Sequence, residues 1–306
     1  MPVDPAAQQV LDMIAAVGAP PLHELTPAAA RAAYAGLALL AGEGASVAST
    51  EARTIAGVPS LVITPHGDGP FPVLVWIHGG GWVIGSAQES VSTTRNLAAA
   101  ADCIVVSLDY RLAPEHKAPA ALEDCIAATG WLLDHAVELG GDPTRIAVGG
   151  DSAGGNLSAL VAIEFGHRLC YQVLVYPGTD LSLDSPSVAE NADGYLLTRD
   201  SMIWFANHYL DGAPVTHEDP RVSPSRATDA QLAAVAPAFV ITAEYDPLRD
   251  EGEAYARRLA ALGVPVVHRR FDGQIHGFYS LPLVIPAGAE AEAQTAELLR
   301  KAFVQH

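Results

Sequence analysis

Short runs of apolar and β-branched residues recur along the chain, and longer segments of helical character separate most of them. This alternation is typical of a mostly parallel sheet that helices cover on both faces. We therefore predict an α/β fold, with an eight-stranded sheet and its chemistry at the carboxyl ends of the strands. The expected strands are residues 47–55, 60–64, 73–77, 103–108, 145–148, 172–176, 239–243 and 266–271. Helices expected between them include residues 118–138, 154–166 and 250–262.

Two more helices are expected before the first strand, at residues 6–17 and 27–43. The second is preceded by Thr26, a good helix cap, and begins with a proline that the first turn tolerates. A stretch rich in Gly and Pro, residues 65–72, predicts a hairpin loop that leads into the strand at 73–77.

Residues 181–224 interrupt the alternation. They contain acids, prolines and one expected helix, Asp200 to Leu210, at a place where a simple crossover would suffice. An insertion of this size is well positioned to fold over the strand ends as a lid, and residues 1–44 are expected to join it. Because there is no internal repeat and no low-complexity linker, residues 1–306 are interpreted as one domain with a helical cap.

The charge balance argues against polyanionic partners. The chain has 306 residues with 17 basic and 35 acidic side chains, a net charge of −18, which repels nucleic acid and anionic membranes. No uninterrupted apolar run reaches the roughly 18 residues of a spanning helix, and Asp4 lies where an export signal would be basic. Three widely spaced cysteines, Cys103, Cys125 and Cys170, fit buried thiols in a reducing cytoplasm. We expect no metal and no cofactor.

The segment Gly150-Asp151-Ser152-Ala153-Gly154 lies between an expected strand and an expected helix. A serine held between small residues at such a turn exposes its hydroxyl, as in the nucleophile elbow of serine hydrolases. Alone the pattern is weak, since turns capped by serine are common. It gains weight from the order of the other pieces, because a nucleophile, then an acid, then a histidine is the order expected for a triad on this kind of sheet.

His276 is the candidate base. It lies in a glycine-containing loop after the last expected strand, from which it can reach back across the strand ends. The other histidines fit less well, since they lie in the expected hairpin, inside a strand or late in helices: His66, His268, His135 and His167.

Asp246, which follows the expected strand 239–243 and precedes a proline, is the candidate acid that orients this base. Asp250 is its main rival, but it lies where a helix begins, so that capping and the helix dipole explain an acid there. Glu244 ranks below both.

Three consecutive glycines follow the strand at 73–77 and match the oxyanion loop of esterases, where backbone N–H groups stabilise developing negative charge. Gly80 and Gly81 are the candidate donors, with the N–H of Ala153 as the third. His78, Gly79 and Asp151 are expected to support this loop, His78 as a hydrogen-bonding prop rather than a proton carrier.

Four blocks together resemble the bacterial, hormone-sensitive-lipase-like branch (family IV) of the α/β-hydrolases. They are the segments 78–82, 110–115 and 150–154 and the pair of segments 246–248 and 276–278. The resemblance spans about residues 45–305 in order and spacing, and the helical start resembles the family's cap. It implies a carboxylesterase for short to medium acyl chains, often dimeric through the last strand of the sheet. Trp82, where phenylalanine is also usual, is expected to narrow the substrate pocket, and the 110–115 block to be structural.

The leading hypothesis is a cytoplasmic serine carboxylesterase that acts on small esters through Ser152. An amidase, carbamate hydrolase or deacetylase with the same triad stays open, because specificity depends on the cap and the pocket. A small-molecule receptor of the same fold is the alternative outside catalysis, and the presence of His276 argues against it.

Overall fold

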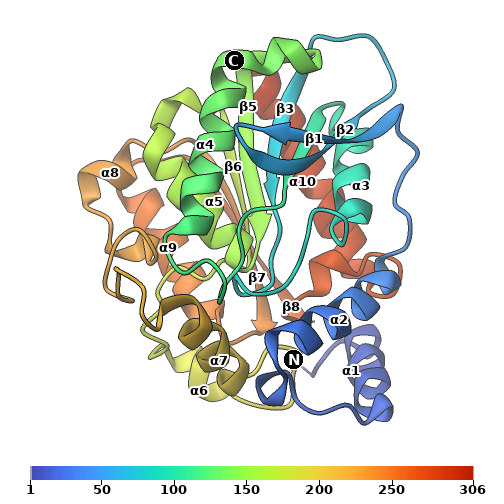
Figure 1. The fold of residues 1–306 in the computed structure, drawn as a ribbon, viewed down its shortest axis with the longest axis vertical. Coiled ribbons are helices and arrows are strands. Elements are labelled where there is room, and N and C mark those ends of the chain that lie inside the picture. The colour runs from blue at the N-terminus through green and yellow to red at the C-terminus, as the bar shows by residue number, and fades with distance from the viewer. Residues whose placement is uncertain (1, 306) are drawn as a thin grey trace.

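The computed structural model describes residues 2–305, and its centre is one eight-stranded sheet with the order β1-β2-β4-β3-β5-β6-β7-β8 (Figure 1). Only β2 runs against its neighbours, and the other strands are parallel to one another. The predicted mostly parallel sheet is confirmed. Its strands are β1 (Ser49–Ile55), β2 (Val58–Thr64), β3 (Phe71–Ile77), β4 (Ile104–Leu108), β5 (Gly141–Asp151), β6 (Tyr171–Val175), β7 (Ala238–Tyr245) and β8 (Val266–Ile275).

Helices cover both faces of the sheet, as Figure 1 shows with the sheet between them. One face packs against α4 (Ala120–His135), α5 (Ala153–Phe165) and α9 (Arg249–Ala261). The other packs against α1 (Pro5–Val17), α3 (Val91–Ala101) and α10 (Pro286–Gln305). Successive residues of the central strand β3 enter the two cores in turn, with Val75 and Ile77 on one side and Leu74 and Trp76 on the other. Because both of their faces are buried, the inner strands β3 and β4 are nearly continuous apolar runs, whereas the edge strands β1 and β8 contain exposed polar residues.

Further helices gather at the carboxyl ends of the strands, at the lower end of Figure 1. They are α2 (Pro27–Ala38), α6 (Pro186–Glu190) and α7 (Arg199–Leu210), and the short α8 (Asp229–Ala233) follows along the chain. Thr26 caps α2 by accepting a hydrogen bond from the Ala29 N–H at 3.3 Å, as its position before Pro27 predicts. The N-terminal part of this layer meets the part that contains α7 where the 3₁₀ turn Leu22–Glu24 contacts α7.

The hairpin prediction for residues 65–72 is wrong. β4 lies between β2 and β3, so the strands on either side of this segment do not pair. The actual hairpin joins β1 to β2 through Ala56 and Gly57, both with positive φ (49° and 86°), as a tight two-residue turn between antiparallel strands requires. The helix expected at 27–43 ends at Ala38 and continues as a 3₁₀ turn, Leu39–Ala41. The short helix α6 was not predicted.

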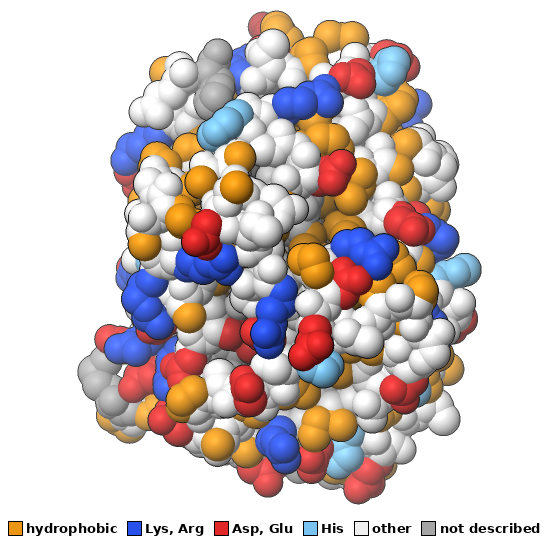
Figure 2. Space-filling view, turned by 90° about the vertical axis from the view of Figure 1, so that its left-hand side faces the viewer, with side chains coloured by type: hydrophobic (Ala, Val, Ile, Leu, Met, Phe, Trp, Pro, Cys, Tyr) orange, Lys and Arg blue, Asp and Glu red, His pale blue; other side chains and the backbone are white. Residues whose placement is uncertain are grey.

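The side of the molecule on which α8 and α9 lie carries interspersed charges of both signs (Figure 2). Lys and Arg side chains there alternate with Asp and Glu instead of forming one basic field. All three cysteines are buried and unpaired. Within residues 2–305, no helix combines the length and apolar character that crossing a bilayer requires.

Candidate active site

Ser152 lies at the sharp turn between the end of β5 and the start of α5, with φ 57° and ψ −117°. This backbone conformation is strained for a residue with a side chain. It is held by hydrogen bonds from the Ser152 N–H to the Val175 carbonyl (2.9 Å) and from the Asn156 N–H to the Ser152 carbonyl (3.0 Å). Gly150 and Gly154 flank the turn, where a Cβ on either would collide with the Ile77 carbonyl of β3. The small residues are therefore required because the neighbouring strand passes close to the turn.

Three side chains from distant parts of the sequence meet at this point. Nε2 of His276 lies 3.0 Å from Oγ of Ser152, and Nδ1 of His276 lies 2.8 Å from Oδ2 of Asp246. Ser152 follows β5, Asp246 follows β7 and His276 follows β8, so the parallel strands deliver all three to one edge of the sheet. The Asp246 carboxylate is fully buried, and 9% of His276 is exposed.

The hydrogen-bond partners assign the imidazole tautomer. An ionised carboxylate can only accept, so Nδ1 of His276 carries the proton that is donated to Asp246. Nε2 is then free to accept the proton of the Ser152 hydroxyl. The second oxygen of Asp246 accepts the Leu248 N–H at 2.9 Å, which fixes the orientation of the carboxylate.

The two rival acids lie elsewhere. Asp250, in the first turn of α9, accepts hydrogen bonds from the Ser187 N–H (2.8 Å) and from Nε of Arg249 (2.8 Å). The predicted capping role is therefore wrong in its detail, because this carboxylate bonds a neighbouring segment and an arginine instead of the N–H groups of its own helix. Glu244 accepts the Gly273 N–H at 2.7 Å.

The three glycines form the loop after β3. The Gly79 N–H donates to Oδ1 of Asp151 at 3.0 Å, whereas the N–H groups of Gly80 and Gly81 donate no hydrogen bond within residues 2–305. Ala153 is the first residue of α5, where N–H groups have no intrahelical acceptor. The structure thus leaves the three expected oxyanion donors uncommitted on the backbone around Ser152.

A buried stack supports this loop from behind. The His78 ring lies 4.3 Å from the Tyr110 ring, its Nδ1–H donates to the Gly79 carbonyl (2.7 Å), and the Tyr110 hydroxyl donates to the His78 carbonyl (2.9 Å). Burial lowers the pKa of His78, so the ring is neutral and suits a prop. Burial also raises the pKa of Asp151 to about 6, although the Gly79 N–H opposes that shift.

Helix α7, in the segment expected to form the cap, packs on the same loop. Trp82 is buried and stacks on Tyr209 of α7, with ring centroids 4.6 Å apart and planes inclined by 5°. Gly81 has φ 57°, and a Cβ there would collide with the ring of Phe205, also on α7. Both the positive φ and the close approach of Phe205 require a glycine at position 81. The same contact shows that α7 packs directly on the loop that carries the expected oxyanion donors.

Two contributors to this centre escaped the sequence analysis. Tyr176, directly after β6, lies with its ring centroid 4.5 Å from that of His276. Arg31 of α2 donates to the carbonyls of Val83 (2.9 Å) and Ala113 (2.9 Å) and to both carboxylate oxygens of Glu115 (2.7 Å each). The position of Tyr176 at a strand end was a usable signal, but no local pattern marks Arg31.

Comparison with known proteins agrees with this architecture. A family described by the alpha/beta hydrolase fold matches residues 74–280. The carboxylesterase NlhH of Mycobacterium tuberculosis is 44% identical over 236 residues, which are 76% of this chain and 74% of that protein. The ethyl acetate hydrolase of Pseudomonas putida is 35% identical over 295 residues, 92% of each chain. The ester-hydrolase EH1AB1 from the metagenome of Lake Arreo, solved with a derivative of bipyridine phosphonate, has a TM-score of 0.93 and 38% identity over 98% of this chain and 99% of that one.

Proposed function

The chain belongs to the alpha/beta hydrolase family, and on that premise we propose that it is a serine carboxylesterase for short- to medium-chain acyl esters. The observation that carries the proposal is the pair of hydrogen bonds from Ser152 to His276 and from His276 to Asp246. The relatives named above are described as ester hydrolases.

The reaction passes through an acyl-enzyme on Ser152. Its Oγ attacks the ester carbonyl carbon while the hydroxyl proton passes to Nε2 of His276, and the carbonyl oxygen becomes an oxyanion that the N–H groups of Gly80, Gly81 and Ala153 stabilise. The intermediate collapses when the bond to the alcohol oxygen breaks and His276 returns the proton to the leaving alcohol. Water then attacks the acyl carbon in the same way and releases the acid and free Ser152.

Asp246 holds His276 in the required tautomer and stabilises the imidazolium that forms in each step. His78, Gly79 and Asp151 keep the oxyanion loop in place, and Trp82 is proposed to bound the substrate pocket from the cap side. The proposal covers one catalytic domain over residues 1–306, with a cap formed by about residues 1–44 and 181–224.

Two finer points belong to the same proposal. The three buried, unpaired cysteines favour a reducing compartment, which supports a cytoplasmic enzyme. β8 lies at one edge of the sheet with Val267 39% exposed, which supports a homodimer that pairs through this strand.

The test is hydrolysis of chromogenic acyl esters of graded chain length by the wild type and by Ser152→Ala. We expect turnover in the wild type and a loss of about 10⁶-fold in kcat in the variant, the scale on which removal of a serine nucleophile acts. An amidase, carbamate hydrolase or deacetylase would instead favour matched anilides, carbamates or N-acetyl compounds. Ligand binding without turnover in the wild type would support a receptor.

A further inference from the structure

α6 of the cap docks on the turn that carries Asp246. Ser187, in the first turn of α6, is fully buried, and its hydroxyl donates to the Pro247 carbonyl at 2.6 Å. Its N–H donates to Oδ2 of Asp250 at 2.8 Å, and the Asp250 N–H donates back to the Ser187 hydroxyl at 3.1 Å. Ser187 thus donates two hydrogen bonds and accepts one, and the three tie α6 to residues on the carboxyl side of Asp246.

Two more contacts close the same junction. Nδ2 of Asn191, just after α6, donates to the Asp246 carbonyl at 3.2 Å. Arg249 reaches Glu190 of α6 at 2.7 Å and Asp250 at 2.8 Å, so it neutralises the carboxylate that holds Ser187. The backbone of Asp246 is thus bonded from the cap, while its side chain faces His276.

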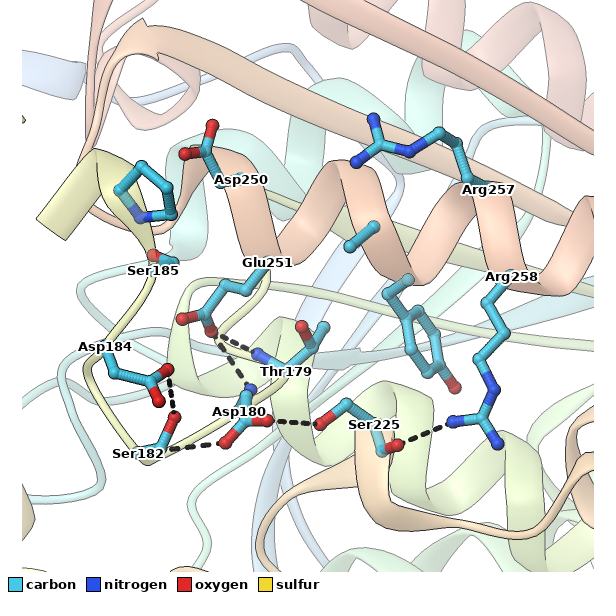
Figure 3. A pocket seen from close by; sticks show the side chains of 13 residues that line it. Thr179, Asp180, Ser182, Asp184, Ser185, Ser225, Asp250, Glu251, Arg257 and Arg258 are labelled. Atoms are coloured by element: carbon cyan, nitrogen blue, oxygen red, sulfur yellow. Dashed lines mark hydrogen bonds between the residues drawn. The ribbon is translucent and has the colours of Figure 1, made fainter.

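The segment that leads from the sheet into the cap is anchored on α9, the helix that carries Asp250. Oε1 of Glu251 accepts the N–H groups of Thr179 (2.6 Å) and Asp180 (3.1 Å), where the chain leaves the sheet for the cap. Figure 3 shows Ser185, at the start of α6, near Asp250 on one side of a pocket of about 480 Å³, with Glu251 beside it. None of the three triad side chains lines this pocket.

We propose that α6 is a fixed clamp on the catalytic acid, with Ser187 and Asp250 as positioning residues that hold Asp246 at the angle His276 requires. The inference rests on the proposed esterase function and explains why an acid stands at position 250 without belonging to the triad. Because α6 is fixed in this way, substrate enters the site past a different part of the cap. Side chains from two segments hold the Asp246 turn: Ser187 and Asn191 in and after α6, and Asp250 in α9. Loss of either set loosens the turn.

The test compares Ser187→Ala and Asp250→Ala with the wild type on one chromogenic ester. We expect kcat to fall by about 10- to 100-fold, the scale of a small misplacement in an active site, with KM within about twofold because the clamp touches no substrate. Asp250→Asn keeps an oxygen that accepts the Ser187 N–H, so it retains more turnover than Asp250→Ala. The double variant Ser187→Ala/Asp250→Ala loses less than the product of the two single losses, since both remove one junction.

Asp184→Asn is the matched control, because this acid lines the same pocket but, within residues 2–305, accepts a hydrogen bond only from the hydroxyl of Ser182. Titration of Ser152 with an organophosphate ester counts reactive enzyme, which separates lower turnover from incomplete folding. Single variants with wild-type kcat, or Asp250→Asn no better than Asp250→Ala, would overturn the clamp. A wild type that neither reacts with the organophosphate nor hydrolyses esters would defeat the esterase proposal instead.

Discussion

Two carboxylates lie near Ser152, and their surroundings differ. Asp246 receives hydrogen bonds from His276 and the Leu248 N–H. Asp151, next to Ser152, receives one from the Gly79 N–H, and burial raises its pKa to about 6. The first acid is thus bonded to the imidazole, whereas the second is bonded to the glycine loop after β3.

Asp246→Asn is expected to lower kcat by about 10⁴-fold, since an amide at this position favours the wrong imidazole tautomer. Asp250→Asn retains far more activity, because its side chain does not reach His276 and its oxygen still accepts the Ser187 N–H. Steady-state kinetics of both variants on the same ester check the ranking. The opposite order would mean that position 250 supplies the triad acid.

At the level of residues, the sequence was informative where chemistry demands a fixed order of short motifs. Ser152, Asp246 and His276 each follow a strand, and parallel strands bring such residues to one edge of the sheet. Arg31 and Glu115 are 84 positions apart, and their contact depends on how α2 packs. Glycines and a serine at a strained turn leave a local pattern, but a long-range ion pair does not.

At the level of elements, pairing partners were harder to predict than the elements themselves. Residues 65–72 carry the glycines and prolines of a turn, but β4 pairs with both β2 and β3 and separates them. Strand order depends on contacts between distant segments, which local propensity does not contain. α6 has five residues and begins at Pro186, so it is too short to show a helical periodicity.

The junction of α3 with α10 makes stability depend on pH. Glu292 of α10 accepts a hydrogen bond from Nδ2 of Asn96 on α3 at 2.8 Å, and burial raises its pKa to about 7. An acid whose folded-state pKa is raised contributes stability that is fully present below its unfolded-state pKa and is lost as the pH rises from there through the folded-state value. Ionising Glu292 at pH 8 therefore costs up to about 3 kcal/mol of unfolding free energy.

Glu292→Gln is expected to remove this dependence, so that its Tm falls less than that of the wild type between pH 5.5 and pH 8. Thermal unfolding followed by circular dichroism at the two pH values measures the difference. Glu297→Gln serves as the comparison, since this acid lies on the same helix, is exposed and pairs with Lys301. Equal pH dependence in the wild type and Glu292→Gln would contradict the assignment.

At the level of the whole molecule, the alternation of strands and helices was sufficient to predict the sheet and its two covered faces. It could not predict how the chain assembles. β8 ends the sheet, and its residues Val267 and His268 are exposed at the strand's start. An edge strand presents unpaired backbone groups that a second copy can complete.

We expect the purified protein to be a dimer by light scattering, and Val267→Lys to shift it toward monomer. The substitution brings two like charges together across a two-fold contact and removes an exposed apolar side chain. Leu283→Lys controls for surface charge, because Leu283 is 72% exposed and lies outside β8. A wild type that stays monomeric at every concentration tested would rule out pairing through this strand.

Through the guanidinium of Arg31, the N-terminal helix α2 bonds the backbone near the Ser152 site. Residues 74–280, which match the family, contain the triad and Glu115 but not the arginine that joins Glu115 to the carbonyls of Val83 and Ala113. A chain trimmed to that range would keep Ser152, Asp246 and His276 but lose the hydrogen bonds that Arg31 donates to the Val83 and Ala113 carbonyls. Chimeras that exchange the N-terminal helices between relatives should therefore transfer Arg31 and its partner Glu115 together.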